Sequence, residues 1–105
     1  MEQIRTLSAL LEYAKKIGKE QGPKKVAVAM AEDAGLISAL EEARVAGFAN
    51  SILVGNGAKI KAAAEQAGVD LANYTVIDEC NEGQMGMKSV ALVSSGEADI
   101  YMKGQ

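Results

Sequence analysis

Two kinds of apolar pattern alternate along the chain. Residues 25–31 (KVAVAMA) form a continuous apolar run, which is typical of a strand buried on both faces of a parallel sheet. The next apolar residues recur at helical spacing, at Leu36, Ile37, Leu40, Ala43 and Ala46. By the same criteria we predict further strands at 51–54, 74–77 and 99–102, and further helices at 4–17, 59–67 and 82–94.

Turn and cap residues support these boundaries. Three predicted helices end in a glycine that can adopt the left-handed conformation of a C-terminal cap, namely Gly47, Gly68 and Gly96. Side chains that can cap helix N-termini precede the same three helices, at Asp33, at Asn56 (or the neighbouring Gly57) and at Asn81. Each strand is therefore expected to follow a helix after a short connection.

This order of elements predicts an α/β fold. Strands that alternate with helices require a parallel sheet with right-handed crossovers and helices on both faces. We predict a three-layer sandwich with a short parallel sheet of four strands, in the order 3-2-1-4. A chain of 105 residues is long enough for one domain, so residues 1–105 are assigned to a single α/β domain.

Composition removes several classes of function. The formal net charge is −3 and aromatic residues make up 4% of the chain, which argues against nucleic-acid binding. The chain has no histidine and one cysteine, Cys80, so a Ser-His-Asp triad, a Cys-His site and an internal disulfide are excluded. The absence of histidine and the single cysteine also lead us to expect no metal and a cytoplasmic location. We expect no membrane partner, because the longest apolar run, 26–31, is too short to cross a bilayer.

Candidate chemistry lies after the strands. In an open parallel sheet, ligands bind beyond the carboxyl ends of the strands, at the point where the winding reverses. The order 3-2-1-4 would bring Glu32 and Asp33, after the first strand, next to Lys103 and Gly104, after the fourth. Lys103 could place a positive charge on an anionic substrate, and Gly104 would let the backbone approach closely.

Each candidate also has a simpler structural interpretation. Asp33 can be a helix cap, and Lys103 with Gly104 can be a solvated lysine and a turn glycine. Residues 55–57 (GNG) could cradle a phosphate, but they lack the spacing of the known phosphate-binding glycine motifs, and a tight turn with a cap is the favoured explanation. Cys80 has no neighbouring base in the sequence that would lower its pKa, so packing is the simpler role.

The combination of these segments carries a resemblance to a known family. Three stretches in this order resemble the phosphate acetyltransferase/phosphate butyryltransferase family: KKVAVAMAEDAGLISALEEARVAGFANSILVGNGAKI, then VIDE, then VALVSSGEADIYMKG. The likeness is closest to the butyryltransferase branch, because of ADIYMKG. It implies a two-domain enzyme of the isocitrate/isopropylmalate dehydrogenase-like fold, which exchanges an acyl group between coenzyme A and inorganic phosphate.

The resemblance also implies that much of such an enzyme lies elsewhere. We expect the chain to be the N-terminal part of a longer enzyme and inactive alone, with coenzyme A or acyl-CoA as a substrate and no tightly bound cofactor. Of the site, only Glu32, Asp33, Lys103 and Gly104 can be carried over as substrate-binding residues, and the catalytic residues are unknown. Self-association is expected, as a homo-oligomer or through an uncovered face.

Two other functions stay open from the sequence. The chain could be a free-standing, non-catalytic α/β module that binds a small anion or a partner protein. It could also be a receiver-like or nucleotide-binding βα domain, because Glu32, Asp33 and Asp78 follow strands, as the acidic residues of a receiver do. That reading is weaker, since a receiver would need a fifth strand and a last helix, and fold analogy alone does not assign function.

Overall fold

The computed structural model describes residues 3–4, 12, 16 and 22–104. Its strands are β1 (Gln3–Ile4), β2 (Lys24–Ala29), β3 (Ala49–Gly55), β4 (Thr75–Asp78) and β5 (Ile100–Lys103). Its helices are α2 (Ala34–Val45), α3 (Gly57–Ala67) and α4 (Glu82–Ser94), with a short 3₁₀ turn, η1 (Leu71–Asn73), before β4. Among these residues, no helix is long and apolar enough to cross a membrane.

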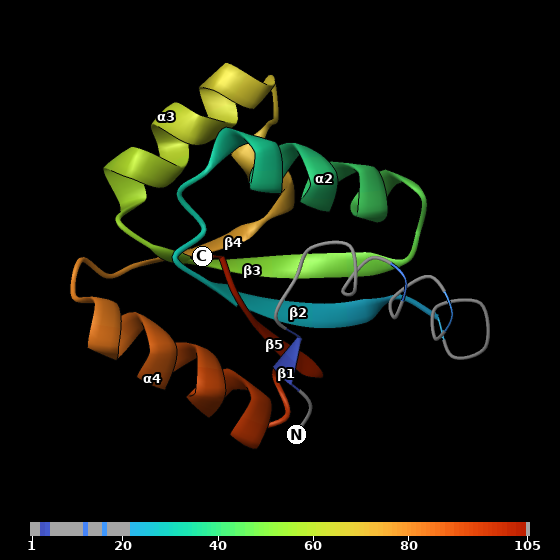
Figure 1. Ribbon diagram of the computed structural model, residues 1–105. Helices are drawn as coiled ribbons and strands as arrows, with labels where there is room; N and C mark the ends of the chain where they lie inside the picture. The colour runs from blue at the N-terminus through green and yellow to red at the C-terminus, as the bar shows by residue number, and fades with distance from the viewer. Residues whose placement is uncertain (1–2, 5–11, 13–15, 17–21, 105) are drawn as a thin grey trace.

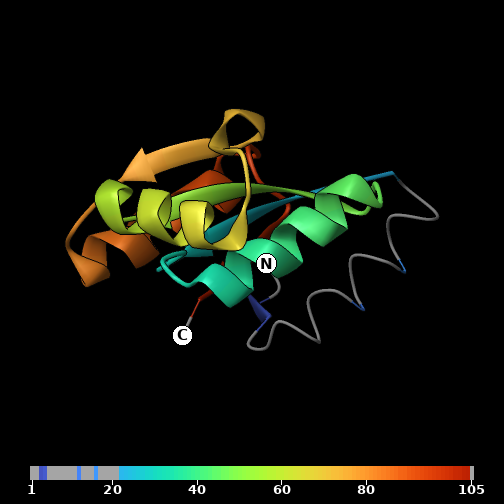
Figure 2. The ribbon, with the colours of Figure 1, turned by 90° about the horizontal axis from the view of Figure 1, so that it is seen from above.

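All strands run parallel in one sheet with the order β1-β5-β2-β3-β4. The four predicted strands therefore lie in the predicted order 3-2-1-4. Helices α2 and α3 cover one face and α4 covers the other, which gives three layers (Figure 1). Figure 2 shows α2 and α3 side by side over the sheet. The α/β sandwich predicted from the sequence is confirmed.

The two faces of the sheet bury separate sets of apolar side chains. The larger core lies between the sheet and helices α2 and α3, and includes Val26, Val28, Leu53 and Ile60. The smaller core lies under α4 and is centred on Met85 and Tyr101. Strand β2 contributes to both cores, and its residues 26–29 are at most 2% exposed. This explains the continuous apolar run from which a doubly covered strand was predicted.

The predicted caps are present. The side chains of Asp33, Asn56 and Asn81 accept hydrogen bonds from the first backbone N–H groups of α2, α3 and α4. The three predicted glycines have φ values of +82°, +71° and +85° at positions 47, 68 and 96. These local signals therefore define where the helices begin and end.

The predicted helix at 4–17 differs from the structure at its first residue. Ile4, its predicted first residue, lies in strand β1, which pairs with β5 through Gln3 and Ile4 opposite Tyr101 and Met102. At Ile4, pairing with the edge of β5 satisfies backbone groups and outweighs the local helical spacing. Glu12 and Lys16 are helical, as predicted, and the remaining residues of the predicted helix lie outside the described residues.

Candidate functional site

The candidate site lies at the carboxyl edge of the sheet, where β2 and β5 end side by side. These strands are neighbours, with Ala29 opposite Lys103 in the register. The chain winds in one direction through α2 and α3, and returns through α4 to β5 (Figure 1). The reversal therefore falls between β2 and β5, which is the position where open parallel sheets bind ligands.

Lys103 and Gly104 differ in their surroundings. Lys103 is the last residue of β5 and is exposed, so its ammonium group is accessible at this edge. Gly104 donates its backbone N–H to the carbonyl oxygen of Ala29 at 2.6 Å. A Cβ atom at position 104 would collide with the Met30 carbonyl oxygen and would lie 3.0 Å from a methyl group of Leu36. The close approach at this glycine is therefore to the end of β2 and to α2.

A strained turn connects β2 to α2. Met30 has a φ of +58°, in the left-handed region that residues other than glycine rarely adopt. Its carbonyl oxygen accepts a hydrogen bond from the N–H of Glu32 at 2.9 Å. The backbone thus reverses sharply beside Gly104. Strained backbone of this kind is common at functional sites. Here Gly104 packs against the turn, beside Leu36 of α2.

The two acidic candidates make structural hydrogen bonds. Asp33 Oδ2 accepts from the N–H of Leu36 at 2.9 Å and caps α2. Glu32 Oε2 accepts from the N–H of Asn56 at 2.8 Å, so this carboxylate reaches across to the end of β3. It is held close to Gly55, where a Cβ atom would lie 3.0 Å from the same oxygen. Glu32 therefore joins the ends of β2 and β3.

Glu32 and Asp33 line a depression between the beginning of α2 and the side of α3. Its volume is about 550 Å³. Ala34 and Gly35 line it from α2, and Lys59, Ala62, Ala63 and Gln66 line it from α3. Lys59 is the basic residue in this lining. The structure thus places the acidic pair toward α3, while Lys103 and Gly104 lie at the end of β5.

The ends of β3 and β4 are also held together by hydrogen bonds. Asp78 Oδ1 accepts from the N–H of Gly57 at 2.8 Å, and the Glu79 N–H donates to the Gly55 carbonyl oxygen at 2.8 Å. These contacts were not predicted from the sequence. The two glycines of the GNG turn, at positions 55 and 57, are the sequence feature that pointed to such contacts. Side chains at these positions would crowd the carboxylates of Glu32 and Asp78.

Glu79 and Cys80 follow β4 at the same edge of the sheet. Lys88 Nζ lies 2.8 Å from Glu79 Oε1, and this hydrogen bond, with help from the Asn81 N–H, holds the pKa of Glu79 below its usual value. Cys80 is exposed, and its Sγ accepts a hydrogen bond from the side-chain amide of Asn56 at 3.3 Å. Among the described residues there is no group of three or more acidic or cysteine side chains that could hold a metal.

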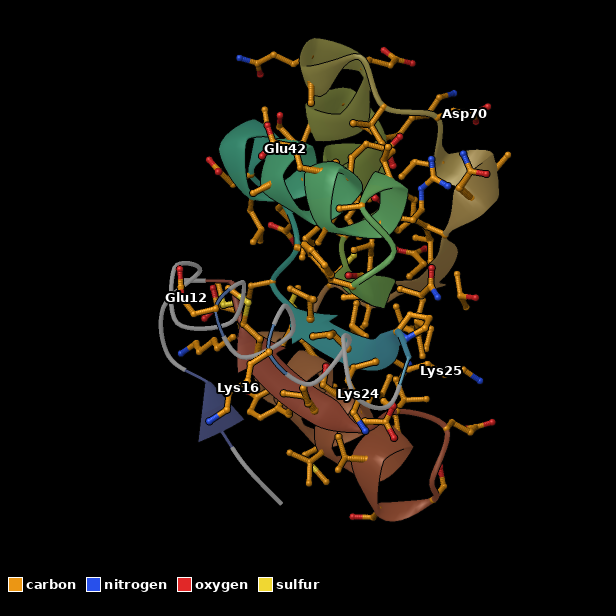
Figure 3. All side chains as sticks on the ribbon, turned by 90° about the vertical axis from the view of Figure 1, so that its right-hand side faces the viewer. Glu12, Lys16, Lys24, Lys25, Glu42 and Asp70 are labelled. Atoms are coloured by element: carbon orange, nitrogen blue, oxygen red, sulfur yellow. The ribbon has the colours of Figure 1, made fainter. Side chains whose placement is uncertain are left out.

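A second depression lies at the opposite edge of the sheet. Its volume is about 320 Å³, and its lining includes Lys25, Asn50, Ser51 and Glu97. Figure 3 views this amino-terminal edge and labels Lys24 and Lys25 at the start of β2. The strands begin at this edge, and their carboxyl ends lie at the opposite edge. Ligands bind open parallel sheets at the carboxyl edge, so this depression is not the favoured site.

Comparisons with known proteins agree with this architecture. The family described as Phosphate acetyl/butaryl transferase matches residues 6–97. The phosphate butyryltransferases of Clostridium acetobutylicum and Clostridium beijerinckii are 40% and 41% identical to this chain over 86 residues. These 86 residues are 82% of this chain but only 29% and 28% of the two relatives, in their N-terminal portion.

A solved structure has the same fold. The EutD phosphotransacetylase from Staphylococcus aureus superposes with a TM-score of 0.66, at 19% sequence identity. The superposition covers 93% of this chain and 38% of that protein. At this identity the likeness extends to the arrangement of helices and strands.

Proposed function

This chain belongs to the phosphate acetyl/butyryl transferase family, and on that premise we propose that it is the N-terminal part of an enzyme that transfers an acyl group between coenzyme A and inorganic phosphate. The observation that carries the proposal is the family match over residues 6–97, together with about 40% identity to two phosphate butyryltransferases. A butyryl group is the acyl chain suggested by these relatives. The enzyme would act in the cytoplasm.

The chemistry defines what the whole site has to supply. In one direction a phosphate oxygen attacks the thioester carbonyl carbon, a C–O bond forms, and the C–S bond breaks to release coenzyme A as a thiolate, which then takes a proton. The reaction therefore needs positive charge near phosphate, donors for the carbonyl oxygen and an acid for the thiolate. Coenzyme A is a substrate here, and no tightly bound cofactor is required.

We assign Lys103 the role of an electrostatic contact to phosphate. It is exposed at the reversal point, and its carboxyl-edge position is the one where α/β sheets bind anions and cofactors. Gly104 keeps the backbone close to β2, so that Lys103 is presented at a fixed place. Glu32 and Asp33 shape the neighbouring wall by fixing the starts of α3 and α2.

The rest of the reacting groups would come from the part of the enzyme that follows the matched segment. The chain would therefore be inactive, or nearly so, in isolation. Association into a homo-oligomer, or through faces that the sheet leaves open, is part of the same proposal.

Variants of Lys103 test its role in the product of the complete reading frame. Lys103→Met should raise the KM for phosphate by at least tenfold, because a charge contact to an anion is lost, and should leave the KM for butyryl-CoA within about twofold. Lys103→Arg, which keeps the charge, should recover part of the loss. Initial rates at varied phosphate give these values. An unchanged KM for phosphate in Lys103→Met would remove Lys103 from the site.

A further inference from the structure

One surface of the molecule is apolar and runs along α4 beside β5. On α4, six residues follow helical spacing and form a continuous stripe, which is Gly83, Gly86, Met87, Val90, Ala91 and Ser94. Together with Tyr101 of β5 they line a shallow groove of about 570 Å³. We call this surface the α4 groove. It contains no charged side chain.

The residues of the α4 groove are suited to contact with another helix. Gly83, Gly86 and Ala91 have little or no side chain, so a second helix backbone could lie close to α4. Met87 is 65% exposed, and its flexible side chain can adapt to a partner. Tyr101, which is 9% exposed, forms the floor on the side of β5. The sheet-facing side of α4 is separate and carries Met85 and Ser89.

The topology indicates which segment would cover this groove. The connection through α4 runs from β4 back to β5, toward the β1 side of the sheet, and it lies on the face opposite α2 and α3. A connection that leaves β5 for a parallel strand farther in the same direction would follow the same right-handed rule. Because β1 already lies beside β5, such a strand would lie beyond β1, and its helix would lie on the α4 face, next to α4 and over β5 and β1.

The lengths of the relatives supply such a segment. The matched part is 29% of the Clostridium acetobutylicum enzyme, in its N-terminal portion, so most of that polypeptide follows it. We propose that the α4 groove is the docking site for an amphipathic helix from the polypeptide that follows this segment in the longer enzyme. The inference rests on the proposed function, because its occupant is the remainder of that enzyme.

The test uses the chain with a defined partner. The tagged 105-residue chain is co-expressed with the untagged part of the Clostridium acetobutylicum phosphate butyryltransferase that follows the matching segment. The same two parts are also joined in a single polypeptide, so that a weak pairing can still be observed. Copurification and the hydrogen exchange of the α4 backbone are measured without substrates.

Met87→Glu is the test variant, and Val45→Glu is its matched control. Both positions are large exposed apolar residues, at 65% and 72% exposure, but Val45 lies on α2, outside the groove. A carboxylate at position 87 would have to be buried under the docked helix without a partner. Thermal unfolding of the isolated variants confirms that both still fold.

The proposal predicts that the partner copurifies and slows exchange across 83–94 at least tenfold in the wild-type chain. Met87→Glu should abolish this protection, and Val45→Glu should leave it unchanged. Equal protection in wild type and Met87→Glu, or no protection in the joined polypeptide, would overturn the proposal. So would a dimer of the isolated chain that Met87→Glu dissociates while the partner fails to bind, since the occupant would then be a second copy.

This outcome is separable from that of the proposed function. If the joined polypeptide protects α4 but transfers no acyl group, the docking proposal is supported and the proposed activity is rejected. If it is active while the backbone of α4 exchanges freely, the proposed activity is supported and the docking proposal is rejected.

Discussion

At the scale of single residues, Asp33 illustrates how one side chain can suggest a ligand site and still have a structural role. The sequence placed it after a buried strand and before a helix, and both interpretations were compatible with that position. The structure shows its carboxylate bound to the N–H of Leu36 at 2.9 Å. A capping contact of this kind stabilises a helix by about 1 kcal/mol.

Substitutions of Asp33 separate the two roles. Asp33→Ala should lower the free energy of unfolding by about 1 kcal/mol, because the cap is lost, and Asp33→Asn should restore most of it, because an amide oxygen also caps. Urea denaturation of the 105-residue chain measures both values. If Asp33→Ala and wild type unfold at the same urea concentration, the cap contributes nothing.

Glycines in two backbone conformations give predictions of opposite sign. Gly68 ends α3 with a φ of +71°, so Gly68→Ala forces a side chain into the left-handed region and should cost about 1 kcal/mol. Gly86 lies inside α4, and a Cβ atom there would meet only the Tyr101 hydroxyl at 3.9 Å. Gly86→Ala should therefore stabilise the chain by roughly 0.5–1 kcal/mol. Thermal unfolding distinguishes them, and shifts in the same direction would contradict this account.

At the scale of helices and strands, local signals determined most boundaries. The caps at Asp33, Asn56 and Asn81 and the three left-handed glycines were readable from the sequence, because each depends on its own side chain or on the lack of one. The strand β1 was not predicted, because two residues carry no periodicity and their pairing with β5 is a long-range contact. The left-handed Met30 turn gave no signal either, since its conformation depends on the packing of β5 and α2 around it.

The contact between Glu79 and Lys88 joins the end of β4 to α4 and should make stability depend on pH. The pKa of Glu79 is lowered in the folded state, mainly by its hydrogen bond with Lys88, so the folded chain prefers the charged form. This contribution is present above the unfolded pKa of about 4.3, and it is lost as the pH falls through the lower folded pKa.

The variant Glu79→Gln tests this linkage. It should be less stable than wild type from pH 7 down to about pH 5, and the difference should disappear as the solution becomes more acidic. In a Lys88→Met background, Glu79→Gln should lower the stability by less, because the hydrogen bond from Lys88 to Glu79 is already lost. Denaturation series at fixed pH values give the comparison. A difference that persists unchanged in acid would rule out Glu79 as its source.

At the scale of the whole molecule, the sequence was sufficient for the fold and for the sheet edge at which the winding reverses. Alternating apolar patterns required a parallel sheet, and the order 3-2-1-4 placed the reversal between the strands that are now β2 and β5. The orientation of the acidic pair was not predictable. Glu32 reaches toward Asn56 because the sharp turn at Met30 directs the chain to β3, and this depends on three-dimensional packing.

The relatives in this family are much longer than this chain, so its function has to be tested in a longer protein. The matched segment is less than a third of the two butyryltransferases, and its exposed α4 groove and its site edge both face outward from the packed core. Lys103 supplies an accessible positive charge at the reversal point, and acyl transfer needs further groups. The unit of activity should therefore be the longer protein.

Acyl transfer from butyryl-CoA to phosphate is the measurement that tests this account most directly. The 105-residue chain and the product of the complete reading frame are compared by the appearance of free thiol, with and without phosphate. Cys80 is exposed and contributes at most one thiol per chain, so turnover is distinguishable from this background. We expect phosphate-dependent turnover in the longer protein and none in the short chain. Absence of turnover in both, or equal turnover in both, would contradict it.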